Sequence, residues 1–365
     1  MFNRIIAIFL LTAFSFGQHP RPAKHVLTDW PEFHGRNMAR WNKAEKFLTV
    51  KNVGNLGLKW STSGLNADTE PAVVNGMVYI GSYDSYVYGL NARTGAVVWG
   101  YATDSSVLSS PAVANGVVYT GSYYGNVFAL NSKTGTLLWN YSTGRFVESS
   151  PTVADGVVYI AAGVSVYALN ASSGALLWQY KTTVYVGSSS PAVKNGIVYV
   201  GLDNGNVYAL NARTGAKLWS YYTRDLVDSS PAVADGMVYI GSRAGKVYAL
   251  NARTGHPLWL YAAGGNVGSP AVAYREVYVS GSELYALDAD TGAKLWSYAT
   301  GGGVATAVAN GVVYTNGDEL YALDAHTGVK LWSYPIGVYS PVVVNGVVYA
   351  AEGDVYAFSL RHGQK

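Results

Sequence analysis

The stretch S-P-A-V-A-D-G-M-V-Y-I-G-S-R-A-G-K-V-Y-A-L-N-A-R-T-G-H-P-L-W, from Ser230 to Trp259, decides the fold of this chain. The same frame begins again at Ser110, Ser150, Ser190 and Ser340. A period of about 40 residues is typical of arrays of small supersecondary units that cannot bury their apolar faces alone. The sequence therefore predicts a repeat protein with a continuous core.

Each repeat has the pattern of four short strands. In the quoted copy they cover residues 231–234, 237–242, 246–250 and 257–261, and Asp235-Gly236 is a two-residue hairpin turn. Asn and Gly stand where a turn needs positive φ, and Val and Tyr where a pleated surface packs. Strands such as Val-Val-Tyr-Ile are apolar on both faces, as in a sheet between two others. This pattern predicts a propeller blade.

A tryptophan near the end of each repeat gives the number of blades. The tryptophans are Trp60, Trp99, Trp139, Trp178, Trp219, Trp259, Trp296 and Trp332. Eight hairpin turns accompany them, and Tyr274-Arg275 is the one that departs from the Asn-Gly or Asp-Gly signal. The last repeat, 341–360, has three strands, and the strand around Trp60 can supply its fourth. We predict an all-β, eight-bladed propeller of four-stranded antiparallel blades, closed by strands from both ends of the chain.

Composition excludes several classes of function. The 365 residues are 49% hydrophobic and 13% charged, with a net charge of +3, and no basic stripe indicates a nucleic-acid partner. Cysteine is absent, which excludes disulfides, thiolate metal sites and a lipidated N-terminal cysteine.

The N-terminus resembles a leader. Asn3-Arg4, the apolar run 5–16 and the small residues of Ser15-Phe16-Gly17 favour a cleaved signal peptide, residues 1–17, over an uncleaved anchor. We expect a periplasmic or secreted monomer with no transmembrane segment after cleavage. Residues 18–51 form a polar segment, in which Trp30 and Phe33 pack on the ring, and residues 52–365 form the propeller.

Two segments carry a resemblance to a known family. A-L-N-A-R-T-G-A-K-L-W (209–219) and A-L-D-A-D-T-G-A-K-L-W (286–296) resemble the tryptophan-docking repeat of PQQ-type, or quinoprotein alcohol dehydrogenase-like, β-propellers. The resemblance covers roughly residues 29–360 and implies structural docking by Trp99, Trp139, Trp178, Trp219, Trp259, Trp296 and Trp332. The same repeat builds dehydrogenases, the assembly factor BamB and sensor domains, so the resemblance is specific for fold and weak for activity.

Candidate binding residues come from loops that differ between copies. The connections between blades and the loops between second and third strands share one face, here the connection face, and the remaining turns share the turn face. Three positions before the strand-opening proline, acids stand in blades one, three and five, and Val267 stands in blade six. The predicted partner-binding residues of this funnel rim are Asp68, Asp104, Arg145, Glu148, Tyr185, Arg224, Asp225 and Asp228. The alternative is a solvated rim without a ligand.

The resemblance leaves two functions open. Active family members use PQQ, calcium, a catalytic Asp, Glu and Asn ligands and often a Cys pair, whereas this chain has no Cys and no inserted loop with such a set. No catalytic or metal-binding residue is therefore predicted. The preferred hypothesis is an exported, non-catalytic propeller scaffold that binds a protein or cell-envelope partner through its funnel face. The alternative is a small PQQ- and calcium-dependent quinoprotein oxidoreductase.

Overall fold

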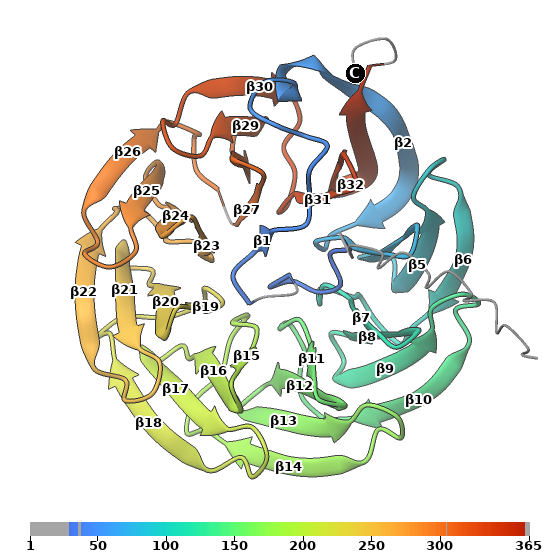
Figure 1. The fold of residues 1–365 in the computed structure, drawn as a ribbon. Coiled ribbons are helices and arrows are strands. Elements are labelled where there is room, and N and C mark those ends of the chain that lie inside the picture. The colour runs from blue at the N-terminus through green and yellow to red at the C-terminus, as the bar shows by residue number, and fades with distance from the viewer. Residues whose placement is uncertain (1–28, 36–37, 304, 362–365) are drawn as a thin grey trace, which may run out of the picture.

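Eight β-sheets stand around one axis like the blades of a propeller (Figure 1). The computed structural model describes residues 29–35, 38–303 and 305–361. Regular structure in these ranges is almost entirely β-strand, with a 3-10 turn at Val53–Asn55. The predicted all-β, eight-bladed propeller is confirmed. The predicted signal peptide lies outside the described residues, and the described ranges contain no helix with the length and apolarity to cross a membrane.

Seven blades take four antiparallel strands consecutively from the chain, from the axis outward. Blades one to four comprise β3 (Ala72–Val74), β4 (Met77–Gly81), β5 (Tyr86–Asn91), β6 (Val97–Ala102); β7 (Ala112–Ala114), β8 (Val117–Gly121), β9 (Asn126–Asn131), β10 (Leu137–Ser142); β11 (Thr152–Ala154), β12 (Val157–Ala162), β13 (Ser165–Asn170), β14 (Leu176–Lys181); β15 (Ala192–Lys194), β16 (Ile197–Gly201), β17 (Asn206–Asn211), β18 (Lys217–Tyr222). Blades five to seven comprise β19 (Ala232–Ala234), β20 (Met237–Gly241), β21 (Lys246–Asn251), β22 (Pro257–Ala262); β23 (Ala271–Ala273), β24 (Glu276–Ser280), β25 (Leu284–Asp288), β26 (Lys294–Tyr298); β27 (Thr306–Ala309), β28 (Val312–Asn316), β29 (Leu320–Asp324), β30 (Lys330–Tyr334).

The eighth blade closes the ring with both parts of the chain. It contains β31 (Val342–Val344), β32 (Val347–Leu360) and β2 (Leu56–Ala67). The first part of β32 pairs with β31 and its second part with β2, and left-handed Gly353 stands between the two parts. The long strand β32 thus takes the place of two blade strands, and the predicted closure by N- and C-terminal strands is confirmed.

Each tryptophan of the outer strands joins its blade to the next. In the middle of the ring, the Trp219 indole N–H donates to the carbonyl of Ala252 at 3.0 Å. A Cβ on Gly255 would lie 2.6 Å from the Trp219 ring, so the turn of the next blade can accommodate only glycine at this place. At the seam, Trp332 donates instead to the Leu56 carbonyl at 3.1 Å. A hydrogen bond from the indole N–H to a backbone carbonyl thus also joins blade seven to the closing strand β2.

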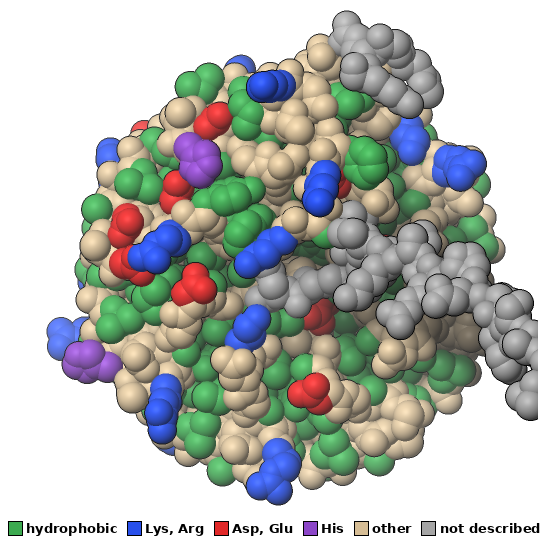
Figure 2. Space-filling view, viewed as in Figure 1, with side chains coloured by type: hydrophobic (Ala, Val, Ile, Leu, Met, Phe, Trp, Pro, Cys, Tyr) green, Lys and Arg blue, Asp and Glu red, His purple; other side chains and the backbone are tan. Residues whose placement is uncertain are grey.

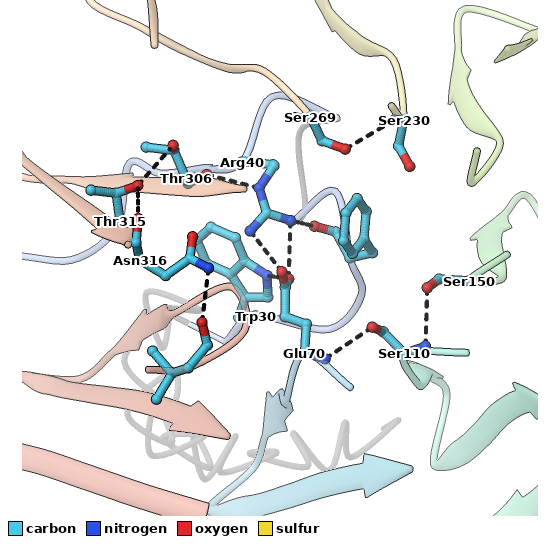
Figure 3. A network of polar contacts seen from close by, with 12 residues as sticks. Trp30, Arg40, Glu70, Ser110, Ser150, Ser230, Ser269, Thr306, Thr315 and Asn316 are labelled. Atoms are coloured by element: carbon cyan, nitrogen blue, oxygen red, sulfur yellow. Dashed lines mark hydrogen bonds and ion pairs between the residues drawn. The ribbon is translucent and has the colours of Figure 1, made fainter. Parts of the chain in front are cut away.

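The serine before the strand-opening proline forms a second link around the axis (Figure 3). The backbone N–H of one blade donates to the serine Oγ of the next in an unbroken series from blade one to blade six, at 2.9–3.0 Å. The donors are Glu70, Ser110, Ser150, Ser190 and Ser230, and the last acceptor is Ser269. This series explains why Ser-Pro recurs: proline opens the inner strand without an N–H, and the serine before it joins neighbouring blades.

The N-terminal segment occupies the centre of the ring and bonds the inner strands blade by blade (Figure 1). Consecutive residues Trp30, Pro31 and Glu32 accept hydrogen bonds from the inner strands of blades one, two and three. Met38, Ala39 and Arg40 do the same for blades five, six and seven, where β1 (Trp41–Asn42) also pairs with β27. Because an unpaired strand edge exposes backbone donors, this segment completes the inner edges of the sheets.

A buried ion pair fixes the segment in the channel (Figure 3). Arg40 Nη2 lies 2.6 Å from Glu70 Oε2, and both side chains are about 2% exposed or less. Arg40 also donates to the carbonyls of Phe33 and Thr306, and the Trp30 indole N–H donates to Glu70 at 3.1 Å. Burial raises the pKa of Glu70 to about 7, and Arg40 opposes that rise.

His34 is buried beside this pair. Neither ring nitrogen forms a hydrogen bond of ordinary geometry within the described part of the chain. Burial, and then the positive charge of Arg40, lower the pKa of His34 to about 3. The imidazole is therefore neutral in the folded protein at physiological pH.

The turn that lacks the glycine signal still forms its hairpin. Tyr274 and Arg275 adopt φ values of 54° and 63°, so both lie in the left-handed region that this turn type requires. The Tyr274 ring packs against Trp41 with centroids 4.9 Å apart, and its hydroxyl accepts a hydrogen bond from the Gly311 N–H at 2.8 Å. These contacts with the central segment and the next blade offset the cost of positive φ in non-glycine residues.

Candidate functional site

Threonines at the ends of the outer strands hold the connection face in place. The Thr143 Oγ1 donates to the carbonyls of Gly125 and Arg145, each at 2.8 Å. Thr103 and Thr223 make the equivalent bonds in blades one and four. Each connection is thus bonded to the loop between the second and third strands of its own blade. These bonds fix the positions of the two loops relative to one another.

A hollow lies on this surface, between the loops of blades two and three and the connections that follow them. Its volume is about 430 Å³, and it is lined by Tyr124, Gly144, Arg145, Phe146, Gly163, Val164 and Tyr185. Phe146 stacks on Tyr123 with ring centroids 4.5 Å apart, yet Phe146 remains 48% exposed and Tyr124 67% exposed. The hollow is therefore walled by aromatic side chains that the fold does not bury. We call it the aromatic hollow.

The carboxylate of Glu148 stands at one side of the aromatic hollow. The hydroxyl of Tyr185 lies beside the Glu148 carboxylate, and burial, followed by the charge of this carboxylate, raises the pKa of Tyr185 to about 12. Asp203 lies near both groups, and its carboxylate packs where a side chain on Gly187 would otherwise stand. Tyr185 therefore connects the apolar lining to a pair of acids.

The acids continue into blade five. Burial, and then the negative charge of Asp228, raise the pKa of Asp203. Asp228 pairs with Arg243 at 2.5 Å, whereas the described residues place no basic side chain within ion-pair distance of Glu148 or Asp203. Negative charge on this side of the aromatic hollow is thus only partly neutralised.

The structure brings some of the predicted rim residues together and separates others. Arg145 and Tyr185 line the aromatic hollow, Glu148 lies beside Tyr185, and Asp228 lies near Asp203. In blade one, Asp68 instead hydrogen-bonds to the hydroxyls of Tyr83 and Tyr339, and burial raises its pKa. The remaining predicted residues do not line the hollow. Asp104 accepts a hydrogen bond from the side chain of Asn126 at 2.7 Å. Arg224 has a left-handed φ, and Asp225 is hydrogen-bonded to Thr223 within the same connection.

One alignment of the repeats needs correction. When the repeats are aligned by counting three positions back from the strand-opening proline, Val267 of blade six is the equivalent of Glu148 and Asp228. In the structure, Val267 contacts Gly241 as Val227 contacts Gly201, so Gly268 is the counterpart of Asp228. Blade six has one residue fewer in this connection, and proline is the wrong reference point there.

Tyr123, Tyr124, Phe146, Val164, Asp203 and Arg243 are site residues that the sequence prediction left out. The second-to-third-strand loops carry a signal that could have found most of them. These loops read Tyr-Tyr in blade two and Gly-Val in blade three, but Asp-Asn in blade four and Arg-Ala in blade five. Aromatic residues in the loops of an otherwise conserved repeat therefore indicate the surface.

The turn face is the side that carries the N-terminal segment and is the one seen in Figure 2. On the face that carries the N-terminal segment, acidic, basic and hydrophobic side chains are scattered over the blades. His326 and Glu276 form an exposed pair there at 3.0 Å. Within residues 29–35, 38–303 and 305–361, no three His, Asp or Glu side chains are grouped as a metal site.

Comparison with known proteins places the chain in a family. The family profile described as outer membrane protein assembly factor BamB matches residues 40–145, 83–225 and 204–365. The chain belongs to this BamB family of PQQ-type propeller repeats. No curated relative matches the chain in sequence.

Solved structures share the fold of this BamB-family chain at low sequence identity. BamB from Moraxella catarrhalis is 20% identical, with a TM-score of 0.72 over 83% of this chain and 99% of that one. Quinohemoprotein alcohol dehydrogenase ADHIIG from Pseudomonas putida HK5 is 19% identical, with a TM-score of 0.78 over 93% of this chain and 81% of that one. The corresponding enzyme from Comamonas testosteroni is 17% identical, with a TM-score of 0.75 and the same coverage. The likeness establishes the fold, which scaffolds and dehydrogenases share.

Proposed function

We propose that this chain is an exported, non-catalytic propeller scaffold that binds a protein or cell-envelope component through its connection face. The observation that supports this most is the aromatic hollow, where Tyr124 and Phe146 remain 67% and 48% exposed. Aromatic side chains are enriched at the centres of protein interfaces and supply much of their binding energy. Membership of the BamB family supports a protein partner and a periplasmic or secreted location.

Charge on the two faces provides the test. Glu148→Ala with Asp228→Ala changes the connection face, and Arg93→Ala with Arg213→Ala changes the turn face. We expect the first pair to weaken capture of envelope proteins and the second to leave it unchanged. Arg93 and Arg213 are exposed and should contribute under about 1 kcal/mol to stability, whereas Asp228 is 18% exposed and pairs with Arg243, so urea denaturation of both variants is measured beside capture. Selective loss of capture in the turn-face pair would assign the partner to the opposite face.

The fold shared with two quinohemoprotein alcohol dehydrogenases favours a second candidate, a small PQQ- and calcium-dependent oxidoreductase. The described residues contain no group of three His, Asp or Glu side chains that marks a metal site, and we derive no reaction step for this candidate. Incubation with PQQ and Ca²⁺, followed by gel filtration, separates the two candidates. An oxidoreductase retains the quinone absorbance and reduces a dye in the presence of alcohols, and a scaffold does neither.

A further inference from the structure

The shape of the aromatic hollow limits what can enter it. Its lining combines the exposed rings of Tyr124 and Phe146 with the aliphatic side chain of Val164, and its volume is about 430 Å³. Pockets lined in this way usually hold one apolar group, with a few polar groups that fix its orientation. One aromatic or branched aliphatic side chain is therefore a fitting occupant.

The polar groups lie on one side and are acidic. The Tyr185 ring lines the hollow, and its hydroxyl lies beside Glu148. The carboxylate is therefore separated from the apolar lining by the length of a tyrosine side chain. Asp203 adds a second carboxylate, which forms no ion pair with a described basic residue and feels the charge of Arg243 only from a distance. Arg145 also lines the hollow, and its aliphatic stem packs against Gly163. A cation beside Tyr185 would complement this arrangement.

We infer that the aromatic hollow binds an extended segment of a partner protein, with an aromatic or aliphatic anchor in the hollow and a lysine or arginine two residues away at Glu148 and Asp203. In an extended chain, residues i and i+2 lie on the same face, about 6.6 Å apart. That spacing matches the reach of a tyrosine side chain from the lining to Glu148. This inference rests on the proposed function and adds the chemistry of the partner.

Short peptides test the inference without a known partner. Three fluorescein-labelled peptides, with Ser and Gly at all other positions, carry Phe-Ser-Lys, Phe-Ser-Glu or Ser-Ser-Lys at their centre. We expect Phe-Ser-Lys to bind the whole chain about tenfold more tightly than either of the others, measured by fluorescence anisotropy. Equal binding of Phe-Ser-Lys and Phe-Ser-Glu, or no saturable binding of any peptide, would overturn the inference.

Two matched pairs of variants locate the binding. Phe146→Glu should abolish binding of Phe-Ser-Lys, and Leu218→Glu, at a residue that is also 48% exposed but lies on the outer strand β18, should not. Glu148→Gln with Asp203→Asn should remove the preference for lysine over glutamate and keep the preference for phenylalanine. Asp155→Asn with Asp235→Asn is the control: it removes two carboxylates from turn-face hairpins where other blades have Asn-Gly. An equal effect of the control would place the cation elsewhere.

The inference and the proposed function can fail separately. If capture of envelope proteins depends on Glu148 and Asp228 but the peptides show no lysine preference, the surface is the right one and the partner chemistry is wrong. If Phe146→Glu changes neither capture nor peptide binding, both are wrong. If the molar mass in solution rises with protein concentration, and Phe146→Glu prevents that rise, a second copy of this chain is the occupant. That result also overturns the inference.

Discussion

Arg40→Met tests how the N-terminal segment is held in the channel. The substitution keeps a long apolar side chain and removes the guanidinium that pairs with buried Glu70 at 2.6 Å. Glu70 then has no counter-ion, and because its pKa is already raised to about 7 by burial, it takes up a proton. The folded variant should therefore contain a neutral Glu70.

The energy of that protonation sets the size of the effect. The ordinary pKa of the Glu70 carboxyl is 4.5, so protonating it at pH 7.5 costs about 1.4 kcal/mol for each of three pH units, or ~4 kcal/mol in total. Because the pKa of Glu70 is raised in the folded state, its protonation costs no stability below pH 4.5 and more as pH rises. At pH 5.5, one unit above 4.5, protonating Glu70 therefore costs only ~1.4 kcal/mol. Loss of the bonds to Phe33 and Thr306 adds about 1–3 kcal/mol for each carbonyl left unpaired at either pH.

A second substitution isolates the electrostatic part. Adding Glu70→Gln to Arg40→Met removes the need for a proton and should restore up to ~4 kcal/mol at pH 7.5 but only ~1.4 kcal/mol at pH 5.5. Urea denaturation at the two pH values measures both gains. If the single variant fails to fold, recovery of folding by the second substitution is the readout. No gain at pH 7.5, or an equal gain at both pH values, would refute the reasoning.

Three further changes test other parts of the structure. Trp219→Ala removes a side chain that is 9% exposed and should cost about 3–5 kcal/mol in urea denaturation; a loss below about 1 kcal/mol would contradict the docking contact with Gly255. Folding lowers the pKa of His34 from an ordinary 6.5 to about 3, so the parent protein loses about 2 kcal/mol of stability through this group as pH falls from 7.5 to 5. The His34→Gln variant should therefore lose about 2 kcal/mol less than the parent over the same range. An identical pH dependence in the two proteins would argue against a buried imidazole. Deleting residues 52–62 removes most of the part of β2 that pairs with β32 and should abolish cooperative thermal unfolding; unchanged melting would contradict the closure of the ring.

The blades could be predicted from the sequence because every local signal is repeated. Asn-Gly turns, tryptophan spacing and strands apolar on both faces all specify the same unit, and the orphan strand at Trp60 specifies the seam. A fold can be predicted from its sequence when the local signals agree with one another. Even Tyr274-Arg275, which lacks the turn signal, forms the turn because its neighbours require it.

The central segment could not be predicted in the same way. It has no period, and its contacts join residues far apart in sequence, as in the bond from Arg40 to Thr306. One signal was present: Glu70 stands where most other repeats have serine before proline. A charged residue at a buried repeat position requires a partner, and Arg40 is that partner.

The candidate site was only partly predictable because it combines loops of three blades. Connection variability indicated Arg145, Glu148 and Tyr185, which the structure places around one hollow. The packing of Phe146 on Tyr123 brings a connection against the loop of the preceding blade, and a count along the chain does not give that contact. The aromatic hollow therefore emerges only from the arrangement of blades.

Site-specific photocrosslinking tests the central claim most directly. A photoreactive phenylalanine analogue at Tyr124, on the aromatic hollow, is compared with one at Lys133 of the turn face, in cells that make the full chain. We expect a discrete crosslinked partner from position 124 that disappears when Phe146→Glu is added, and no such product from position 133. The same product from position 133, or no product from position 124, would contradict partner binding by the connection face.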